Sequence, residues 1–436
     1  MSEKVDTTPA NENKRGFLFL QGPHGPFYAE LSQHLEDLGH KTWRVAFNQG
    51  DVAFWKNKKT LIRYTEPLTE WANYFRELVK SKKITDIVLY GDTREIHATA
   101  VLHAKRLNLT VHVFEEGYLR PYWVTYERNG SNGNSRLMDM SVAQLREMTK
   151  RLKEKHVLPP AHWGDTRHHV FYGALYHWFV MFANLRFPNF TPHRKTTAAQ
   201  EFKWHLRRLY RRPFHSLLRW RASRRVSRLS VPYHLVMLQL EHDASVQYHS
   251  PFNTTQEFLD VVFQAFANGA PSQHHLVFKS HPLDDGRVNL RKIVTELAAH
   301  HGVEDRVHFI YGGKLAKLLD HAKTAVTINF TAGQQALWRS IPLKTFGSSI
   351  YGKPEFVSDA PLSEFFADPD QPDSEAYILF REFLLCTSQL PGGFYSPSGR
   401  RQLLRSLTET MLAKNDPYDN FMKTPKPRGT ILRLVG

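Results

Sequence analysis

The 436-residue sequence predicts an α/β protein with two Rossmann-like domains that face a cleft. One observation is a strand–helix–strand crossover, in which the short apolar runs Ile84–Tyr90 and Val111–Phe114 flank the helical apolar spacing of His97–Leu107. A second series of apolar strands begins at Tyr233. The chain is also too long for one ordinary core, and its 41% hydrophobic residues are enough to fill two.

The cysteine content and the lack of long apolar segments indicate the cellular compartment of the protein. The single cysteine, Cys386, excludes a disulfide framework and a Cys-based zinc site, which fits a reducing environment. Residues 1–15, the expected disordered tail, are polar and lack the apolar core of a secretory signal. The nearest candidate for a membrane span, Val170–Leu185, is too short and contains His177. We therefore expect a cytoplasmic protein.

The N-terminal domain is expected over residues 16–200. Its elements before the crossover are, in order, the strand Gly16–Gln21, a helix ending at Leu38, the strand Lys41–Phe47 and the helix Thr69–Lys80. The turn after the first strand contains Gly22, His24 and Gly25, and such a turn brings backbone N–H groups toward a ligand. It matches neither a Walker loop nor the dinucleotide-binding G-x-G-x-x-G pattern.

Polar residues follow both strands of the crossover. Asp92 and Arg94 come after the first strand, and Glu115 and Glu116 come after the second, with Arg120 close behind. In open α/β sheets ligands bind outside the carboxyl ends of parallel strands, so both clusters are candidate site residues. The alternative is a solvated loop that happens to be acidic.

Two segments with unusual composition connect the domains. Trp163–Phe187 is aromatic-rich, and either packs on the N-terminal domain or adds to an interfacial surface. Residues 201–230 are the expected linker, and Glu201–Arg228 holds ten Lys or Arg residues and one acid, more than half of the net charge of +16. Interleaved aromatic and leucine residues are typical of a segment that lies on anionic lipid. Nucleic-acid binding and a solvated helix are the alternatives.

The C-terminal domain is expected over residues 231–395, followed by a helix and basic tail over 396–436. Its strands place polar residues at their carboxyl ends: Asp243, then Lys279, His281 and Pro282, then Thr331, Ala332 and Gly333. The last three start a helix and form a natural phosphate seat. Lys279, His281 and Thr331 would converge on one anionic group. Two such domains suit a GT-B-like nucleotide-sugar glycosyltransferase.

Six motifs carry a family resemblance: QGPHGPFY (Gln21–Tyr28), YGDTREIH (Tyr90–His97), FEEGYLRP (Phe114–Pro121), QLEHDAS (Gln239–Ser245), KSHP (Lys279–Pro282) and NFTAGQQAL (Asn329–Leu337). Together they resemble the capsule polysaccharide biosynthesis/export family, whose members look like retaining β-Kdo transferases that start the Kdo linker on a phosphatidylglycerol-type lipid. The resemblance implies a CMP-Kdo donor, held through His281-Pro282 and Thr331-Ala332-Gly333. The chain departs from the family pattern at His242 and Phe330.

Retention of configuration needs either two displacements through a covalent sugar–enzyme ester or a front-face route. For the first route we expect Asp243 to be the nucleophile, and Glu115 or Glu116 to be the base that takes the acceptor proton. The donor's own carboxylate and phosphate would be repelled by these acids. The cations available to offset that repulsion are Arg94, Arg120, Lys279 and His281. No metal or other cofactor is expected.

The expected partners are an anionic inner-membrane lipid acceptor and other capsule biosynthesis or export proteins, with no nucleic acid. The protein is expected to be peripheral on the inner membrane. A non-catalytic export or assembly factor of the same fold is the main alternative to an enzyme. A nucleic-acid-binding protein is favoured by charge alone.

Overall fold

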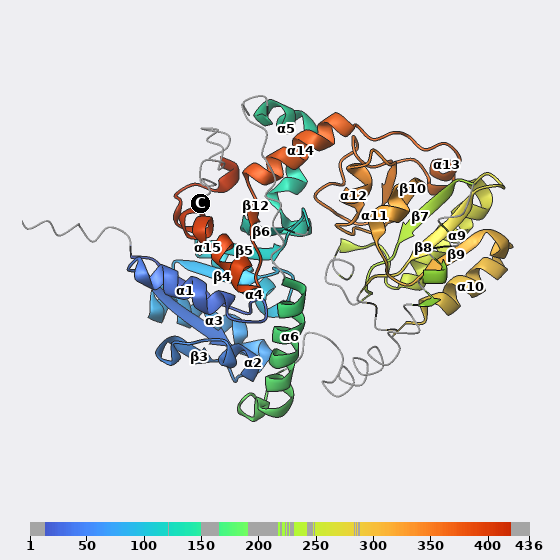
Figure 1. The fold of residues 1–436 in the computed structure, drawn as a ribbon. Coiled ribbons are helices and arrows are strands. Elements are labelled where there is room, and N and C mark those ends of the chain that lie inside the picture. The colour runs from blue at the N-terminus through green and yellow to red at the C-terminus, as the bar shows by residue number, and fades with distance from the viewer. Residues whose placement is uncertain are drawn as a thin grey trace, which may run out of the picture.

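The computed structural model describes residues 14–419 apart from positions 121, 150–164, 191–216, 219, 223, 225, 227–230, 242–246, 248, 283, 285 and 287. It contains two α/β units, each built on its own sheet (Figure 1), so the predicted fold class is confirmed. The expected nucleophile Asp243, most of the basic segment 201–230 and the N-terminal tail lie outside the described residues.

The N-terminal sheet has the strand order β12-β6-β5-β4-β1-β2-β3. Its strands are β1 (Gly16–Phe19), β2 (Lys41–Ala46), β3 (Leu61–Arg63), β4 (Asp86–Tyr90), β5 (Thr110–Glu116), β6 (Trp123–Arg128) and β12 (Gln389–Pro391). The strands from β3 to β5 are parallel, whereas β6 and β12 add an antiparallel edge. Its helices are α1 (Phe27–Asp37), α2 (Gln49–Ala53), α3 (Trp71–Lys82), α4 (Glu95–Arg106), α5 (Val142–Thr149), α6 (Asp165–Phe182) and α15 (Pro397–Leu412).

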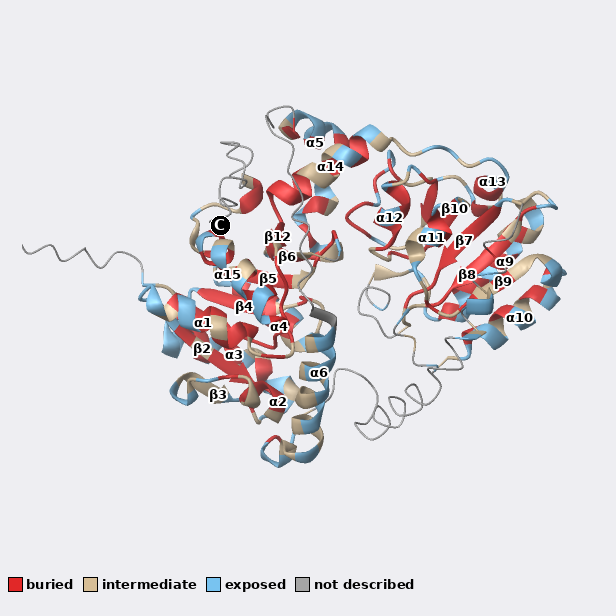
Figure 2. Cartoon of the chain, viewed as in Figure 1, coloured by how far each residue is buried: buried red, intermediate tan, exposed pale blue. Residues whose placement is uncertain are grey.

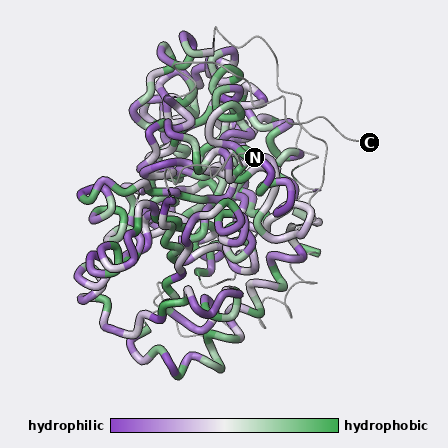
Figure 3. The backbone as a smooth tube through the Cα atoms, turned by 90° about the vertical axis from the view of Figure 1, so that its left-hand side faces the viewer, coloured by the Kyte–Doolittle hydropathy of each residue, from purple (hydrophilic) through white to green (hydrophobic). Residues whose placement is uncertain are grey.

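Alternation along the strands gives this sheet two packed faces. Phe17 and Phe19 of β1 pack with α1 and α15 on one face, while Leu18 packs with α3 and α4 on the other. The expected crossover is present as β4, α4 and β5, with Ile87 opposite Val111 in parallel register. Figure 3 shows hydrophobic and hydrophilic residues alternating along the outer helices, as amphipathic helices require.

The C-terminal sheet is parallel throughout its described strands, in the order β11-β10-β7-β8-β9. The strands are β7 (Tyr233–Met237), β8 (His275–Lys279), β9 (Val307–Ile310), β10 (Ala322–Thr327) and β11 (Leu343–Thr345). The helices are α9 (Thr255–Gly269), α10 (Leu290–His300), α11 (Leu315–Leu319), α12 (Gly333–Leu337), α13 (Leu362–Ala367) and α14 (Ser374–Cys386). Helices α9, α10 and α13 cover one face, and α11 and α12 cover the other.

The chain returns to the N-terminal sheet after α14, so the structure differs from the expected boundary at residue 395. Strand β12 pairs with β6, with Gln389 opposite Thr125, and α15 covers the face beyond it. The pairing satisfies backbone groups of β6 that would otherwise form an open sheet edge. Buried side chains of α14, including Tyr377 and Phe380, join a core that also contains Tyr118. Figure 2 shows this buried layer running between the two sheets.

Candidate functional site

The carboxyl ends of the two sheets meet at a contact between loops. Asp92, which follows β4, accepts a hydrogen bond from the Ser131 N–H at 3.0 Å. The ring of His249, from the loop after β7, lies so close to the same turn that a Cβ at Gly133 would be 2.5 Å from it. The carbonyl oxygen of His249 accepts a hydrogen bond from Asn329 Nδ2 at 3.2 Å, and Asn329 follows β10. The strand ends of the two units therefore face each other, as in the expected two-domain arrangement.

Asp92 has a structural position in this contact. Its side chain is 4% exposed, and it also accepts a hydrogen bond from Asn134 Nδ2 at 3.2 Å. Burial lowers the pKa of His249 below its ordinary value, although the Asp92 carboxylate opposes that effect. The imidazole is therefore neutral near pH 7. The structure thus assigns Asp92 to holding the 131–134 turn against the second unit, a function that the sequence pattern did not indicate.

A second contact brings together the two predicted clusters. Gln334, in α12, donates a hydrogen bond from Nε2 to the carbonyl oxygen of Tyr118 at 2.9 Å. Tyr118 belongs to the loop between Glu116 and Arg120, and Gln334 directly follows Gly333. Tyr118 and Ala332 are also buried in the same core. The loop that follows the paired glutamates therefore lies beside the expected phosphate seat.

Hydroxyl groups hold the Glu116 carboxylate in place. Its Oε1 accepts hydrogen bonds from Tyr90 and Tyr395, each at 3.2 Å. Burial, and to a smaller extent the Glu116 charge, raise the pKa of Tyr90 well above its ordinary value, so its hydroxyl remains a donor. Glu115 lies over Gly91, where a Cβ would be 2.9 Å from Glu115 Oε1. Both glutamates belong to β5, which extends beyond its expected end at Phe114 because it pairs with β6.

Lys279 is a buried cation of the C-terminal unit. It ends β8, its side chain is 5% exposed, and burial lowers its pKa to about 8. Its Nζ donates a hydrogen bond at 3.4 Å to the carbonyl oxygen of Ser280. An ammonium group has three N–H donors, so an anion placed here would complete its hydrogen bonding. This arrangement suits phosphate binding.

His281 lies beside Phe330, the residue that precedes Thr331 in the chain. The ring of His281 packs against the ring of Phe330, with centroids 5.4 Å apart. Phe330, a departure from the family pattern, therefore orients the histidine. Helix α12 has five residues, from Gly333 to Leu337, so its dipole is smaller than that of a full helix. Lys279 and His281 consequently account for more of the expected attraction for an anion.

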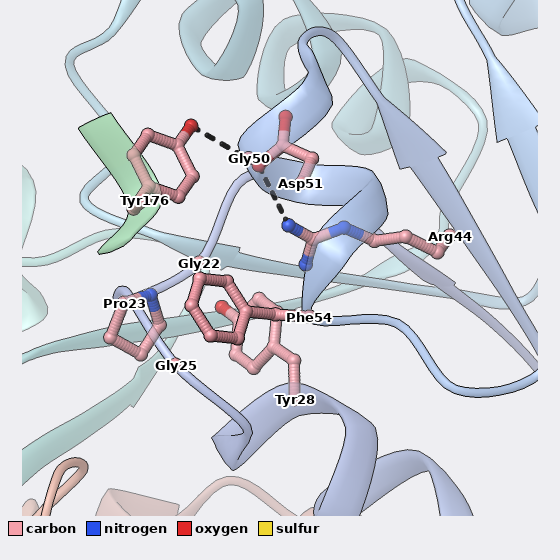
Figure 4. Close-up of a pocket in the computed structure, with 9 residues that line it drawn as sticks. All are labelled: Gly22, Pro23, Gly25, Tyr28, Arg44, Gly50, Asp51, Phe54 and Tyr176. Carbon is pink, nitrogen blue, oxygen red and sulfur yellow. Dashed lines mark hydrogen bonds and ion pairs between the residues drawn. The ribbon is translucent and has the colours of Figure 1, made fainter. Parts of the chain in front are cut away.

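The glycine turn after β1 is covered by aromatic side chains (Figure 4). A Cβ at Gly22 would lie 2.5 Å from the Tyr28 ring, and one at Gly25 would lie 3.0 Å from the Tyr172 ring. The ring of His24 stacks on Tyr176, with centroids 4.3 Å apart. These contacts explain Gly22 by packing against α1 and Gly25 by packing against α6. The remaining cavity, about 10 Å³, has room for about one water molecule.

A buried ion pair, Arg44 with Asp51, lies beside this turn and had no counterpart among the predicted site residues. Arg44 Nη2 and the Asp51 carboxylate are 3.0 Å apart, and Gln21 Nε2 donates to the same carboxylate at 3.2 Å. Arg94 joins the network by donating to Gln21 Oε1 at 3.3 Å. The network fixes Arg94 at the N-terminal strand ends. The signal that could have found it is a charged residue, Arg44, between the apolar residues Trp43 and Val45 of strand β2.

The remaining predicted site residues are exposed or half-buried. Arg120 is exposed, and its Nε donates to the Gly117 carbonyl oxygen at 3.2 Å. Pro282 is exposed, and Thr331 is half-buried. Within the described part of the chain, no three His, Cys, Asp or Glu side chains are grouped as a metal site would require. The roles expected of Asp243 and of these residues remain predictions.

Comparison with known proteins identifies a matching protein family and several similar proteins. The family model for capsule polysaccharide biosynthesis protein matches residues 85–395. The capsule polysaccharide export protein KpsS of Escherichia coli is 29% identical over 384 residues, covering 87% of this chain and 96% of that protein. The capsule polysaccharide modification protein LipB of Neisseria meningitidis serogroup A is 30% identical over 390 residues, covering 88% and 93%. Among solved structures, the β-Kdo 2,7 transferase KpsC of Thermosulfurimonas dismutans matches with a TM-score of 0.42 and 12% identity, covering 91% and 99%.

Proposed function

This chain belongs to the capsule polysaccharide biosynthesis protein family, and we propose that it transfers Kdo from CMP-Kdo to a phosphatidylglycerol-type lipid with retention of configuration. The observation that supports the proposal is the Gln334–Tyr118 hydrogen bond, which joins the loop after the glutamates of one unit to helix α12 of the other, where the phosphate seat is expected. A sugar nucleotide needs both kinds of group. Its phosphate needs cations, and transfer of its sugar needs a base.

The C-terminal unit would hold the CMP half of the donor. One N–H group of the Lys279 ammonium donates to the Ser280 carbonyl oxygen. A phosphate beside Lys279 would accept hydrogen bonds from its other N–H groups. His281, oriented by Phe330, would donate a further hydrogen bond from its ring. The proposed donor site consists of Lys279, His281, Pro282, Thr331, Ala332 and Gly333, with Arg120 at its edge.

The reaction would proceed in two displacements. In the first, a carboxylate oxygen of Asp243 bonds to the anomeric carbon while the bond from that carbon to the phosphate oxygen breaks, and CMP leaves with the electron pair. In the second, the acceptor hydroxyl gives its proton to Glu115 or Glu116 and its oxygen attacks the same carbon, which releases Asp243. Two inversions give net retention. The fixed hydroxyls of Tyr90 and Tyr395 orient Glu116 for this step.

A non-catalytic role in capsule export is the second candidate. The observation that favours it is that a relative covering most of the chain, from Escherichia coli, is described as an export protein. On that alternative the same fold would bind partner proteins or a sugar nucleotide without turning it over. Release of CMP from CMP-Kdo separates the two.

The test is an incubation of purified protein with CMP-Kdo and a short-chain phosphatidylglycerol analogue, followed by mass spectrometry of the lipid. The proposal expects free CMP and a lipid heavier by a whole number of Kdo residues. Intact donor and unmodified lipid under conditions where the protein binds CMP would favour the export role. We place the protein at the cytoplasmic face of the inner membrane, where an anionic lipid acceptor and the basic segment 201–230 would meet.

A further inference from the structure

Helix α6 has an inner face that is locked onto the N-terminal unit. The Tyr176 ring covers Gly50, where a Cβ would lie 2.6 Å from it, and its hydroxyl accepts a hydrogen bond from Asn48 Nδ2 at 2.7 Å. One turn away, Tyr172 covers Gly25. Two tyrosines seated on glycines leave the helix one orientation about its own axis. The direction of its outer face is therefore fixed by the fold.

The outer face of α6 carries a stripe of large apolar side chains in solvent. Phe171, Trp178 and Phe182 are 60%, 51% and 63% exposed, and Leu185, in the turn after the helix, is 95% exposed. Their spacings of seven, four and three residues put them on one side of a helix. Figure 2 shows the outer side of α6 as largely exposed. A contiguous stripe of this kind marks an interaction surface, whereas scattered exposed residues do not.

The charge around the stripe identifies the chemistry of its partner. Exposed Arg167 and Arg186 stand at its two ends. From Arg167 to Arg228 the sequence holds fourteen Lys or Arg residues and one acid, Glu201, but most of these positions lie outside the described residues, so only Arg167 and Arg186 are assigned to the stripe. In a second copy seated on the same face, these two arginines would meet arginines of the same charge and repel them. An anionic bilayer offers both the phosphates and the apolar layer that the surface matches.

We propose that the outer face of α6 docks the protein on an anionic membrane. Phe171, Trp178 and Phe182 would enter the boundary between headgroups and acyl chains, and Arg167 and Arg186 would contact phosphates. The inference rests on the proposed function only in that the lipid acceptor would lie in the same bilayer. Because α6 is seated on the turn after β1, docking would hold the strand ends of the N-terminal unit at a fixed height above the lipid.

A single-cysteine probe tests the docking face. Cys386 is the only cysteine of the sequence, so the Cys386→Ser chain can carry Ala174→Cys, an exposed position on the stripe side of α6. Labelled there with an environment-sensitive dye, the protein should show a blue-shifted emission with vesicles of phosphatidylglycerol and phosphatidylcholine. The matched control, Ala98→Cys on the exposed side of α4, should show no shift. Equal emission from both sites would overturn the proposal.

Removal of the stripe gives an independent measurement. The triple variant Phe171→Ser, Trp178→Ser and Phe182→Ser should partition onto those vesicles at least about tenfold more weakly, because the apolar contribution is lost. Leu102→Ser, which removes an exposed leucine of α4, should bind as the parent does. Vesicle binding and turnover of a water-soluble acceptor are measured separately, so failure of one does not imply failure of the other. Unchanged binding by the triple variant, or a dimer that depends on the stripe in light scattering, would contradict the lipid assignment.

Discussion

Lys279→Met should weaken CMP binding while it stabilises the fold. The side chain of Lys279 is almost fully buried, and burial lowers its pKa from 10.5 to about 8. That change corresponds to about 3 kcal/mol of free energy spent on keeping the ammonium protonated at neutral pH. Methionine fills similar space without the charge. The variant should therefore unfold at a higher temperature than the parent at pH 7.

The sign of the pH dependence follows from the lowered pKa. Below about pH 8 the folded protein bears the unfavourable charge, and as the pH rises from about 8 to 10.5 the parent loses the proton and gains stability relative to its unfolded state. The advantage of Lys279→Met in thermal stability should shrink over that range. A phosphate that pairs with the ammonium would restore the charged form. CMP affinity of the parent, measured by calorimetry, should then fall by up to about tenfold per pH unit above pH 8.

A second buried lysine provides the control. Lys344 lies in β11, where burial also lowers its pKa, and its Nζ donates to the Ala360 carbonyl oxygen at 2.6 Å. Lys344→Met should leave CMP affinity and its pH profile unchanged. The loss of a charge-assisted hydrogen bond in Lys279→Met should weaken CMP binding by about ten- to a hundredfold at pH 7. A Lys279→Met protein that binds CMP as tightly as the parent would refute the assignment of the phosphate site.

Three further predictions concern other parts of the chain. His281→Ala should weaken CMP binding in calorimetry without lowering the melting temperature of the protein; unchanged affinity would make the histidine structural. Burial raises the pKa of Glu127 to about 8, so folded protein retains a proton that the unfolded chain releases above its ordinary value of 4.5, and stability should fall as pH rises between these values. Glu127→Gln should flatten that dependence in thermal denaturation, and an unchanged slope would show that Glu127 does not cause it. Serine substitutions in the basic segment should weaken binding to anionic vesicles by at least about tenfold, at about 1 kcal/mol per cation, and spare turnover of a soluble acceptor. The positions are Arg207, Arg208, Arg211 and Arg212. Equal binding by that variant and the parent would exclude the segment as an anchor.

Local patterns predicted much of the architecture. Strands β1 and β2 begin at their expected residues, Gly16 and Lys41, because a short apolar run next to polar residues defines a parallel strand by itself. The extension of β5 to Glu116 depends on pairing with β6, and β12 pairs with a strand more than 260 residues away. Such contacts leave no periodic signal in the chain. The return of the C-terminal segment to the first sheet was therefore missed.

For the candidate site, the sequence pattern indicated positions but not contacts, and the roles expected of the residues remain predictions. The strand-end rule indicated both Glu115 and Thr331, and the structure sets their loops side by side through Gln334 and Tyr118. The sequence could not show that Gly22 and Gly25 accommodate tyrosine rings, because a glycine that lets a ligand approach and one that lets a side chain approach look the same in a sequence. The hydrogen bond from Tyr395 to Glu116 could not be predicted either, because the two residues are far apart in the sequence and no local pattern links them.

The covalent route is tested by the mass of the protein after incubation with CMP-Kdo, in variants that lack the base. Glu115→Gln or Glu116→Gln should complete the first displacement but slow the second, since only the second needs acceptor deprotonation. We expect protein heavier by one Kdo residue, with the added mass mapped by peptide analysis to Asp243, and neither adduct nor transfer in Asp243→Ala. Full activity of Asp243→Ala, or an adduct on another residue, would contradict that route.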